Sequence, residues 1–374
     1  MSKLVILAAG GTGGHLFPAE ALARELISRG YRVALVTDPR GQAFGDKLGV
    51  ELHRIRAGRI GGGIASKVVA AAEVALGTFE AQRLLKKLAP ACVIGFGGYP
   101  SVPTMLAATR MRLPSLIHEQ NALLGRANRL LAPRAGRIAT SFAETGGIRV
   151  EDRPRVTVTG NPVRPAIGAL RGTAYVSAKS DEPFRLLVIG GSQGASILSK
   201  ILPLALEETP VAVRSRLQVS HQARPEDLAQ VRESYSELGI AADLASFFDD
   251  VPTRLAQAHL VISRSGASSV AEIAAIGRPA ILVPFAHAAD DHQTLNARAF
   301  AASGAAWVLR ESEFTPQTLA TRLEALMHDP QRLERAAAAA FAQGKPHAAR
   351  ALADLIDADA GGANGAPVAR KDAA

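Results

Sequence analysis

The sequence predicts an α/β protein of two domains, each built on a parallel sheet with helices on both faces. Three observations lead to this fold class. The chain has 374 residues, more than one hydrophobic core usually supports, and 48% of them are apolar. Short apolar runs typical of buried strands alternate with helical segments, which calls for parallel sheets. A strand, a glycine loop and a helix follow one another near the N-terminus and again halfway along the chain.

The first half begins with this strand, loop and helix. Lys3 to Ala9 contains a continuous apolar run that ends at glycines, as expected of a buried strand. The next helix has one apolar face, and Tyr31 to Thr37 is the second strand. Further strands of this half are expected at residues 91–94, 115–117 and 156–158.

The second half repeats the pattern from Phe184. The strand 184–189 precedes Gly190-Gly191-Ser192-Gln193-Gly194-Ala195 and an amphipathic helix, and later strands are expected at 259–263 and 280–284. The turn-rich stretches 160–165 and 172–183 indicate a connection between domains. We therefore expect domains at 1–163 and 164–344. Residues 358–374 are rich in Gly and Ala without periodicity, which predicts a disordered tail.

Composition limits the compartment and the partners. Cys92 is the single cysteine, which excludes an internal disulfide and a cysteine-based zinc cluster. The N-terminus lacks the pattern of a signal peptide and no apolar run reaches bilayer length, so we expect a cytoplasmic protein. Residues 1–165 carry 23 Lys and Arg against 11 Asp and Glu, a balance of +12, and the rest carries 20 against 23. The basic half predicts an anionic partner: nucleic acid, a phosphorylated substrate or an anionic lipid surface.

Glycine loops at strand ends are the first functional signal. In Gly10-Gly11-Thr12-Gly13-Gly14-His15, the absent side chains let backbone N–H groups approach a phosphate or sugar at a helix N-terminus. The alternative is a tight turn that serves only packing. A third cluster, residues 95–101, also follows a strand. Because ligands bind at the carboxyl ends of parallel strands, two such sheets predict a cleft between the domains.

A dinucleotide-binding site is the weaker interpretation of the first loop. Asp38 ends the second strand, where an acidic residue could hold an NAD ribose. The glycine fingerprint fails, because Leu16 stands where the third glycine should be when the pattern starts at Gly11. Binding of NAD, followed by difference spectra, would revive this alternative.

Six motifs occur in an order and spacing that is specific when they are taken together. They are Gly10-Gly11-Thr12-Gly13-Gly14-His15, Gly97-Gly98-Tyr99, His118-Glu119-Gln120-Asn121, Gly160-Asn161-Pro162-Val163-Arg164, Gly190-Gly191-Ser192-Gln193-Gly194-Ala195 and Ser263-Arg264-Ser265-Gly266-Ala267. With them the chain resembles, from about residue 4 to about residue 355, the transferases of glycosyltransferase family 28 that convert lipid I to lipid II.

This resemblance implies the GT-B fold, in which two Rossmann-like domains face each other across a cleft. The implied reaction moves GlcNAc from UDP-GlcNAc to the 4-hydroxyl of the MurNAc sugar of undecaprenyl-diphospho-MurNAc-pentapeptide, with inversion and without a cofactor. The implied N-terminal domain faces the lipid acceptor and the C-terminal domain binds the nucleotide sugar. A helix at about 345–357 is expected to pack back on the first domain. Cell-wall and cell-division proteins are candidate partners, and the implied location is the cytoplasmic face of the inner membrane.

Inversion requires a base near the acceptor hydroxyl and positive dipoles near the leaving diphosphate. His15 is the first candidate base, because its loop directs it into the cleft, an imidazole titrates near neutral pH, and it matches the family's loop histidine. Its alternative roles are to position the acceptor or to cap the helix. Glu119 is the rival base, and its alternative role is to hold a loop by hydrogen bonds.

The resemblance also assigns donor contacts. Ser192 lies at the start of a helix whose backbone N–H groups can donate hydrogen bonds to a phosphate. Arg164 can bind the diphosphate, and Glu272 can accept hydrogen bonds from the ribose hydroxyls. Arg164 could instead be a surface charge in a hinge, and Glu272 could instead serve helix electrostatics. Adjacent phenylalanines are more often core, so only the backbone of Phe248 is expected to contact uracil. The implied donor residues are Thr12, Gly13, Gly14, Asn121, Arg164, Ser192, Phe248, Ala267, Glu272, Gln293 and Asn296.

The stretch 287–293 contains two histidines and two aspartates, but their spacing fits no standard metal-ligand pattern. We expect no metal ligand there, and the resemblance makes Gln293 and Asn296 sugar contacts. Arg and helix N-terminal amides can supply the leaving-group stabilisation that a cation supplies elsewhere.

A membrane surface is the remaining expected partner. Apolar residues recur at helical spacing from Ile64 to Phe79, beside Lys67, Arg83, Lys86 and Lys87, so this helix could lie on an anionic bilayer. The alternative is a helix packed on its own sheet with a solvated basic face. A lipid-anchored acceptor favours the membrane, with a site near this helix and near Arg110 and Arg112.

Two other functions remain as alternatives. One is another nucleotide-sugar enzyme, such as a glycolipid glycosyltransferase or a UDP-sugar epimerase, which product analysis would distinguish. The other is a basic binding protein for nucleic acid. The sequence has no helix-turn-helix, RNP-like or zinc signature, so we expect no nucleic-acid partner.

Overall fold

The computed structural model describes residues 2–10, 13–37, 49–58, 63–191 and 194–361. Contacts divide the chain into two compact units. The first extends to Gln120 and also includes Leu124–Thr159 and the chain from His347, and the second comprises Asn121–Leu123 and Gly160–Pro346. The division after Thr159 falls four residues before the boundary expected at 163, and the sequence did not indicate that 121–123 would group with the second unit.

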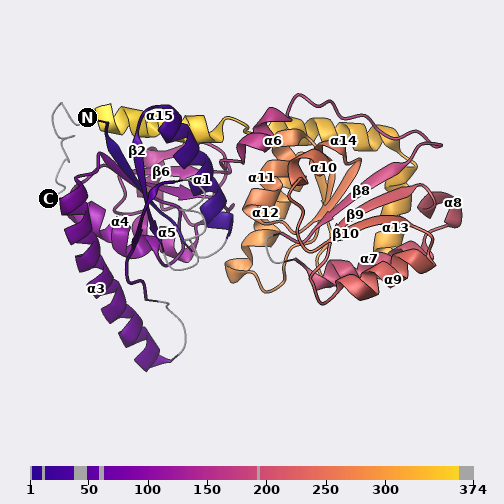
Figure 1. Cartoon of the computed structure of the whole chain (residues 1–374), viewed down its shortest axis with the longest axis horizontal. Helices are drawn as coiled ribbons and strands as arrows, with labels where there is room; N and C mark the ends of the chain where they lie inside the picture. Colours follow the sequence, from indigo (N-terminus) through magenta and orange to yellow (C-terminus); the bar gives the residue numbers. More distant parts are fainter. Residues whose placement is uncertain (1, 11–12, 38–48, 59–62, 192–193, 362–374) are drawn as a thin grey trace. The chain divides into compact units, whose positions relative to one another are not determined.

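The first unit contains a sheet whose described strands are all parallel to their neighbours, in the order β3-β2-β1-β4-β5-β6-β7 (Figure 1). Because β1 pairs with both β2 and β4, the winding of the chain reverses beside β1, where open α/β sheets bind ligands. The strands are β1 (Leu4–Ala8), β2 (Arg32–Thr37), β3 (Glu51–Arg54), β4 (Cys92–Gly95), β5 (Ser115–Glu119), β6 (Arg137–Thr140) and β7 (Val156–Val158).

Helices cover both faces of this sheet because its central strand is apolar on both faces. Val5 and Leu7 pack with α1 (Gly13–Ser28) and α15 (Ala348–Gly361). Leu4 and Ile6 pack with the opposite layer, α3 (Ile64–Leu88) and α4 (Ser101–Arg110). The short α5 (Arg126–Leu131) and the 3-10 helix η2 (Val150–Arg155) complete the unit.

Helix α15 corrects the expectation of a disordered tail from residue 358. The helix continues to Gly361 and lies beside α1 (Figure 1). Two polar contacts hold its last turn: Asp359 forms an ion pair with Arg137, and the carbonyl of Ala360 accepts a hydrogen bond from Lys3. The rest of the expected tail, 362–374, lies outside the described residues.

The second unit contains a parallel sheet of described strands in the order β10-β9-β8-β11-β12-β13. The winding reverses beside β8, as it does beside β1 in the first unit. The strands are β8 (Phe184–Ile189), β9 (Leu217–Gln222), β10 (Ala241–Ala245), β11 (Leu260–Ser263), β12 (Ala280–Leu282) and β13 (Ala306–Val308).

The main core of this unit joins one face of β8 and β9 to α7 (Ser196–Glu208), α9 (Leu228–Glu237) and α13 (Pro316–Met327). In Figure 1, α11 (Ala267–Ile276) and α14 (Pro330–Gln343) belong to the other layer. The remaining helices are α6 (Pro165–Ala169), α8 (Val211–Arg214), α10 (Val251–Gln257), α12 (His292–Ala301) and the 3-10 helix η3 (Ala289–Asp291).

Candidate functional site

In the first unit, two glycine loops meet at the reversal point of the sheet. Gly97, after β4, has φ +89°, and a Cβ at this position would lie 3.2 Å from Cδ2 and 3.3 Å from Nε2 of His15. A side chain at Gly97 would therefore displace the imidazole. Gly13 and Gly14 form the first residues of α1, and Thr12 lies outside the described residues. The loops that the sequence indicated after β1 and β4 thus do come together.

Glu119 is buried at the end of β5, and its carboxylate holds the following segment. Its Oε2 accepts hydrogen bonds from the backbone N–H of Gly125 at 2.8 Å and from Nδ2 of Asn128 at 2.9 Å. Asn128 also donates to the carbonyl of His118 at 3.0 Å and lies close to Gly97. These contacts fix the start of α5 beside the His15 loop.

The second unit brings together two predicted donor residues. Nε of Arg164 donates to Oε1 of Glu272, and Nη2 donates to Oε2, both at 2.8 Å. The arginine side chain is 29% exposed and the glutamate side chain 12%, so both carboxylate oxygens are held at the edge of the protein surface. This bidentate pair is the strongest polar arrangement that a guanidinium and a carboxylate can make.

Asn296 lies fully buried at the centre of a second network in this unit. Its Oδ1 accepts from the backbone N–H of Ala122 at 2.8 Å. Its Nδ2 donates to Oδ1 of Asn121 at 3.0 Å and to the carbonyl of Ser265 at 3.1 Å. The side chain is 0% exposed and supports Asn121, and the direct sugar contact expected of Asn296 stays a prediction.

Gln293 lies in the first turn of α12, and its side chain is oriented by the neighbouring loop. Its Oε1 accepts from the backbone N–H of Phe285 at 3.0 Å, and its carbonyl accepts from the hydroxyl of Ser265 at 2.8 Å. The NH2 of Gln293 is then the part of the amide that can donate to a ligand. Ser265 thus supports two predicted donor residues, Gln293 and Asn296.

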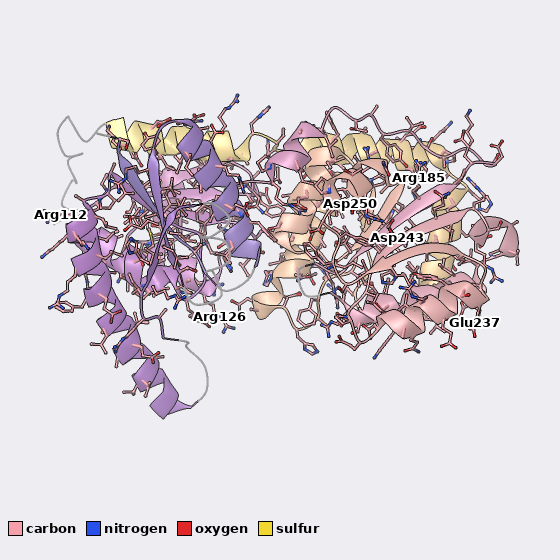
Figure 2. All side chains as sticks on the ribbon, in the orientation of Figure 1. Arg112, Arg126, Arg185, Glu237, Asp243 and Asp250 are labelled. Atoms are coloured by element: carbon pink, nitrogen blue, oxygen red, sulfur yellow. The ribbon has the colours of Figure 1, made fainter. Side chains whose placement is uncertain are left out.

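Phe248 lies in a different setting from its neighbour Phe247. Phe248 is 5% exposed, whereas Phe247 is 61% exposed. The guanidinium of Arg254 lies 4.0 Å from the centre of the Phe248 ring and forms ion pairs with Asp243 and Asp250, both labelled in Figure 2. The ring of Phe248 is therefore structural, which leaves its backbone as the candidate contact with uracil.

Two further residues are predicted to contact the donor. Ala267 is the first residue of α11, and Ser192 lies outside the described residues.

The structure also shows supporting residues to which sequence analysis assigned no individual role. Asn128, Ser265 and Arg264 contact predicted site residues or the loops that carry them. Arg264 donates to the carbonyls of Val283 and Pro284 and forms an ion pair with Glu311. Arg264 and Ser265 belong to one of the six motifs, whereas for Asn128 the sequence has no local signal.

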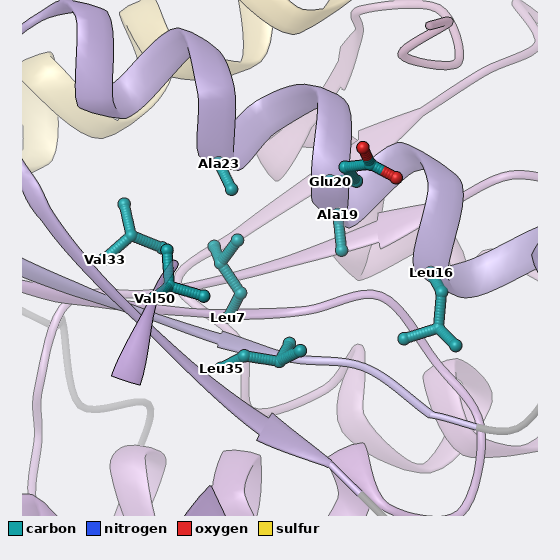
Figure 3. Close-up of a pocket in the computed structure, with 8 residues that line it drawn as sticks. All are labelled: Leu7, Leu16, Ala19, Glu20, Ala23, Val33, Leu35 and Val50. Atoms are coloured by element: carbon teal, nitrogen blue, oxygen red, sulfur yellow. The ribbon is translucent and has the colours of Figure 1, made fainter. Parts of the chain in front are cut away.

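Neither a metal-ligand cluster nor the small cavity beside α1 points to a different site. No group of three His, Cys, Asp or Glu residues in the described ranges could hold a metal ion. A small cavity of about 10 Å³ lies between α1 and the sheet, and Glu20 is the single charged residue among those labelled in Figure 3. This apolar lining has no donors for a diphosphate.

Helix α3 presents the described apolar residues of its stripe, from Val68 to Phe79, to the surface of the first unit. Val68, Leu76 and Phe79 are between 51% and 64% exposed, while the opposite face packs inward. A Cβ at Gly77 would clash with the carbonyl of Arg56, so the small residue sets the close approach of this face. Arg83 lies 4.3 Å from the Phe79 ring, and the side chain of Lys67 is not among those described.

The alternative interpretation required this stripe to pack on the sheet of its own unit. The described residues of the stripe do not do so, because they are exposed. Arg112, after α4, is another exposed basic residue of this unit (Figure 2). No helix in the described part of the chain is both long and apolar enough to cross a bilayer.

The chain matches known proteins along most of its length. Residues 5–140 match the glycosyltransferase family 28 N-terminal domain, and residues 185–352 match the C-terminal domain of that family. The UDP-N-acetylglucosamine--N-acetylmuramyl-(pentapeptide) pyrophosphoryl-undecaprenol N-acetylglucosamine transferase of Rhodospirillum centenum is 56% identical over 362 residues, 96% of each chain. The protein of the same name from Paramagnetospirillum magneticum is 54% identical over 355 residues, 94% of this chain and 96% of that one.

A solved structure, that of Acinetobacter baumannii MurG, has the same fold. The TM-score is 0.79 at 31% identity, and the match covers 95% of this chain and 99% of that chain. The family and fold inferred from the six motifs are thereby confirmed. The chain belongs to glycosyltransferase family 28 and has the two-domain GT-B fold of that family.

Proposed function

We propose that this protein transfers GlcNAc from UDP-GlcNAc to the 4-hydroxyl of the MurNAc sugar of lipid I and so forms lipid II for peptidoglycan synthesis. The observation that carries this proposal is the 56% identity, over 96% of both chains, to a transferase named for that donor and acceptor. Because the match covers 96% of this chain, it extends across both units.

His15 is the proposed base. The acceptor oxygen attacks C1 of GlcNAc, the bond from C1 to the diphosphate oxygen breaks, and the proton of the hydroxyl passes to His15. UDP leaves from the opposite face, so the configuration at C1 inverts. The position of the imidazole against Gly97, at the reversal point of the first sheet, suits it for this task.

Glu119 is proposed to position this site and not to act as the base. Its Oε2 already accepts two hydrogen bonds from the start of α5, and the residue is 2% exposed. A base must reach the hydroxyl whose proton it takes, which a buried carboxylate engaged in loop contacts does poorly.

The second unit is proposed to hold the donor. Glu272 would accept the ribose hydroxyls, Gln293 would donate to the sugar, and the backbone of Phe248 would contact uracil. Arg164 supplies positive charge beside the diphosphate. Asn121, supported by Asn296, completes the set.

A membrane surface is proposed as the place of reaction, at the cytoplasmic face of the bacterial inner membrane. The exposed apolar residues of α3 and the exposed Arg83, Lys86 and Lys87 together suit a peripheral contact with anionic lipid. An acceptor with an undecaprenyl anchor must be reached at that surface.

Product analysis tests the proposed function. Purified protein is incubated with radiolabelled UDP-GlcNAc and a lipid I analogue. The expected outcome is an acceptor heavier by one N-acetylhexosamine for each UDP released. Conversion of UDP-GlcNAc to its 2-epimer without transfer would instead support an epimerase. Absence of turnover with tight DNA binding would support the binding-protein alternative.

A further inference from the structure

The Arg164–Glu272 pair joins residues that are 108 positions apart in the sequence. Each carboxylate oxygen of Glu272 accepts one N–H of the guanidinium at 2.8 Å. A bidentate pair of this kind fixes the plane of the carboxylate as well as its position. The two oxygens of Glu272 therefore have a defined orientation, which a single hydrogen bond would not impose.

Both partners project from constrained backbone. Arg164 is the residue before α6, between Val163 and Pro165, and the α6 residue Ile167 is fully buried. Glu272 lies in the second turn of α11, which packs on α6. The ion pair thus connects two packed helical segments of the second unit.

We propose that Arg164 acts on the nucleotide sugar through Glu272, as the positioning residue that orients the carboxylate toward the ribose. This inference rests on the proposed function. A carboxylate has about four lone-pair sites, and the guanidinium occupies two of them. One site on each oxygen can still accept a ribose hydroxyl. Without the arginine, the carboxylate rotates and its charge repels the diphosphate of the same ligand.

In the proposed function, the guanidinium also carries the positive charge beside the diphosphate. A lysine can replace this charge, but it has no planar fork and cannot hold both oxygens of Glu272. This difference between charge and geometry makes the inference testable.

The test compares binding of UDP and of 2′-deoxy-UDP by calorimetry. Wild type should bind UDP about tenfold or more tightly, because a hydrogen bond to a charged group contributes at least that factor. Arg164→Lys should lower this preference to less than about threefold. Glu272→Ala should abolish it, and adding Arg164→Lys to Glu272→Ala should leave the ratio unchanged, because the arginine acts through the carboxylate.

Arg149→Lys is the matched control, because Arg149 also forms a bidentate pair, with Asp152 in the first unit. It should retain the wild-type preference. Circular dichroism verifies that each variant is folded, because Trp307 lies in the second unit and Arg149 lies in the first. The inference is overturned if Arg164→Lys weakens both ligands equally and keeps the wild-type ratio, or if wild type does not distinguish the two nucleotides. Failure of the proposed function is distinguishable, because it would appear as missing GlcNAc transfer by the wild type.

Discussion

Asn296 fixes the position of Asn121 within the second unit. Its Nδ2 donates to Oδ1 of Asn121 at 3.0 Å, while its Oδ1 accepts from the backbone N–H of the next residue, Ala122, at 2.8 Å. One buried amide thus holds both the side chain and the backbone of the segment 121–123. This explains why the segment groups with residues far away in the sequence.

Asn296→Ala should lower the unfolding free energy of the second unit by about 2 kcal/mol or more, because several buried polar groups lose their partner at once. Asn121→Ala removes one half-buried partner and should cost about 1 kcal/mol or less. Urea unfolding followed by the fluorescence of Trp307 measures both, because this single tryptophan of the chain lies on β13, which contacts α12. Equal losses in the two variants would contradict the supporting role of Asn296.

Sequence analysis located eight strands, and most of them contain a run of buried apolar residues, as expected in a parallel sheet that is covered on both faces. They are β1, β2, β4, β5, β7, β8, β11 and β12. β3 and β10 lie at the sheet edges and contain polar residues, such as Glu51 and Asp243, so no such run marks them. β9 alternates apolar and polar residues, so no continuous apolar run marks it either.

The sequence named candidate site residues but not the contacts between them. The loop motif and the family resemblance indicated His15, Arg164 and Glu272, and their roles toward a ligand stay predictions. The bidentate pair of Arg164 and Glu272 and the burial of Asn296 depend on tertiary packing, which no local pattern encodes. Helix α15 likewise extends past residue 357 because of contacts with Lys3 and Arg137, at distant positions in the chain.

His15→Ala should lower kcat by about 10²-fold or more, because a general base contributes about that much. The affinity for UDP should change little. His328→Ala, which removes an exposed histidine at the end of α13, is the matched control and should keep full activity. Single-turnover rates with a lipid I analogue and calorimetry with UDP separate the two effects.

The companion variant Glu119→Gln distinguishes the two candidate bases. It retains an oxygen that can accept from Gly125 and Asn128, so it should keep kcat within about tenfold of wild type. A larger loss in Glu119→Gln than in His15→Ala would assign the base to Glu119. A loss of less than about threefold in His15→Ala would leave His15 a structural role.

Replacing both Lys86 and Lys87 with Glu should weaken sedimentation with phosphatidylglycerol vesicles by about tenfold or more, because each basic residue near an anionic leaflet contributes about 1 kcal/mol. Lys200→Glu with Arg232→Glu makes the same change in charge on exposed residues of the second unit and should have a smaller effect. High salt should release part of the wild-type protein, since it screens the charges but not the apolar contact of α3. Equal binding by the two double variants would contradict a membrane contact at α3.

Acidification should destabilise the second unit through His221. Burial lowers the pKa of His221 to about 4, against a smaller opposing effect of Asp227, and Nδ1 lies 2.8 Å from the hydroxyl of Tyr235. In the unfolded chain, a histidine binds a proton near pH 6.5. The contribution of neutral His221 to the free energy of unfolding is therefore fully present above that pH, and it is lost as the pH falls toward 4.

Between pH 7 and pH 4.5 this residue should account for about 2 kcal/mol of lost stability. His221→Gln removes the titration, so its unfolding free energy should fall less steeply over this range than that of wild type. Urea unfolding at several pH values, followed by Trp307, compares the two slopes. Parallel slopes would show that His221 does not contribute.

The central claim, inverting transfer of GlcNAc to lipid I, is tested most directly by proton NMR of the product formed from UDP-GlcNAc and a lipid I analogue. Because the donor sugar is α-linked to UDP, direct displacement predicts a single β-linked GlcNAc on the 4-hydroxyl of MurNAc. An α linkage, attachment at another hydroxyl, or free 2-epimer without transfer would contradict the account.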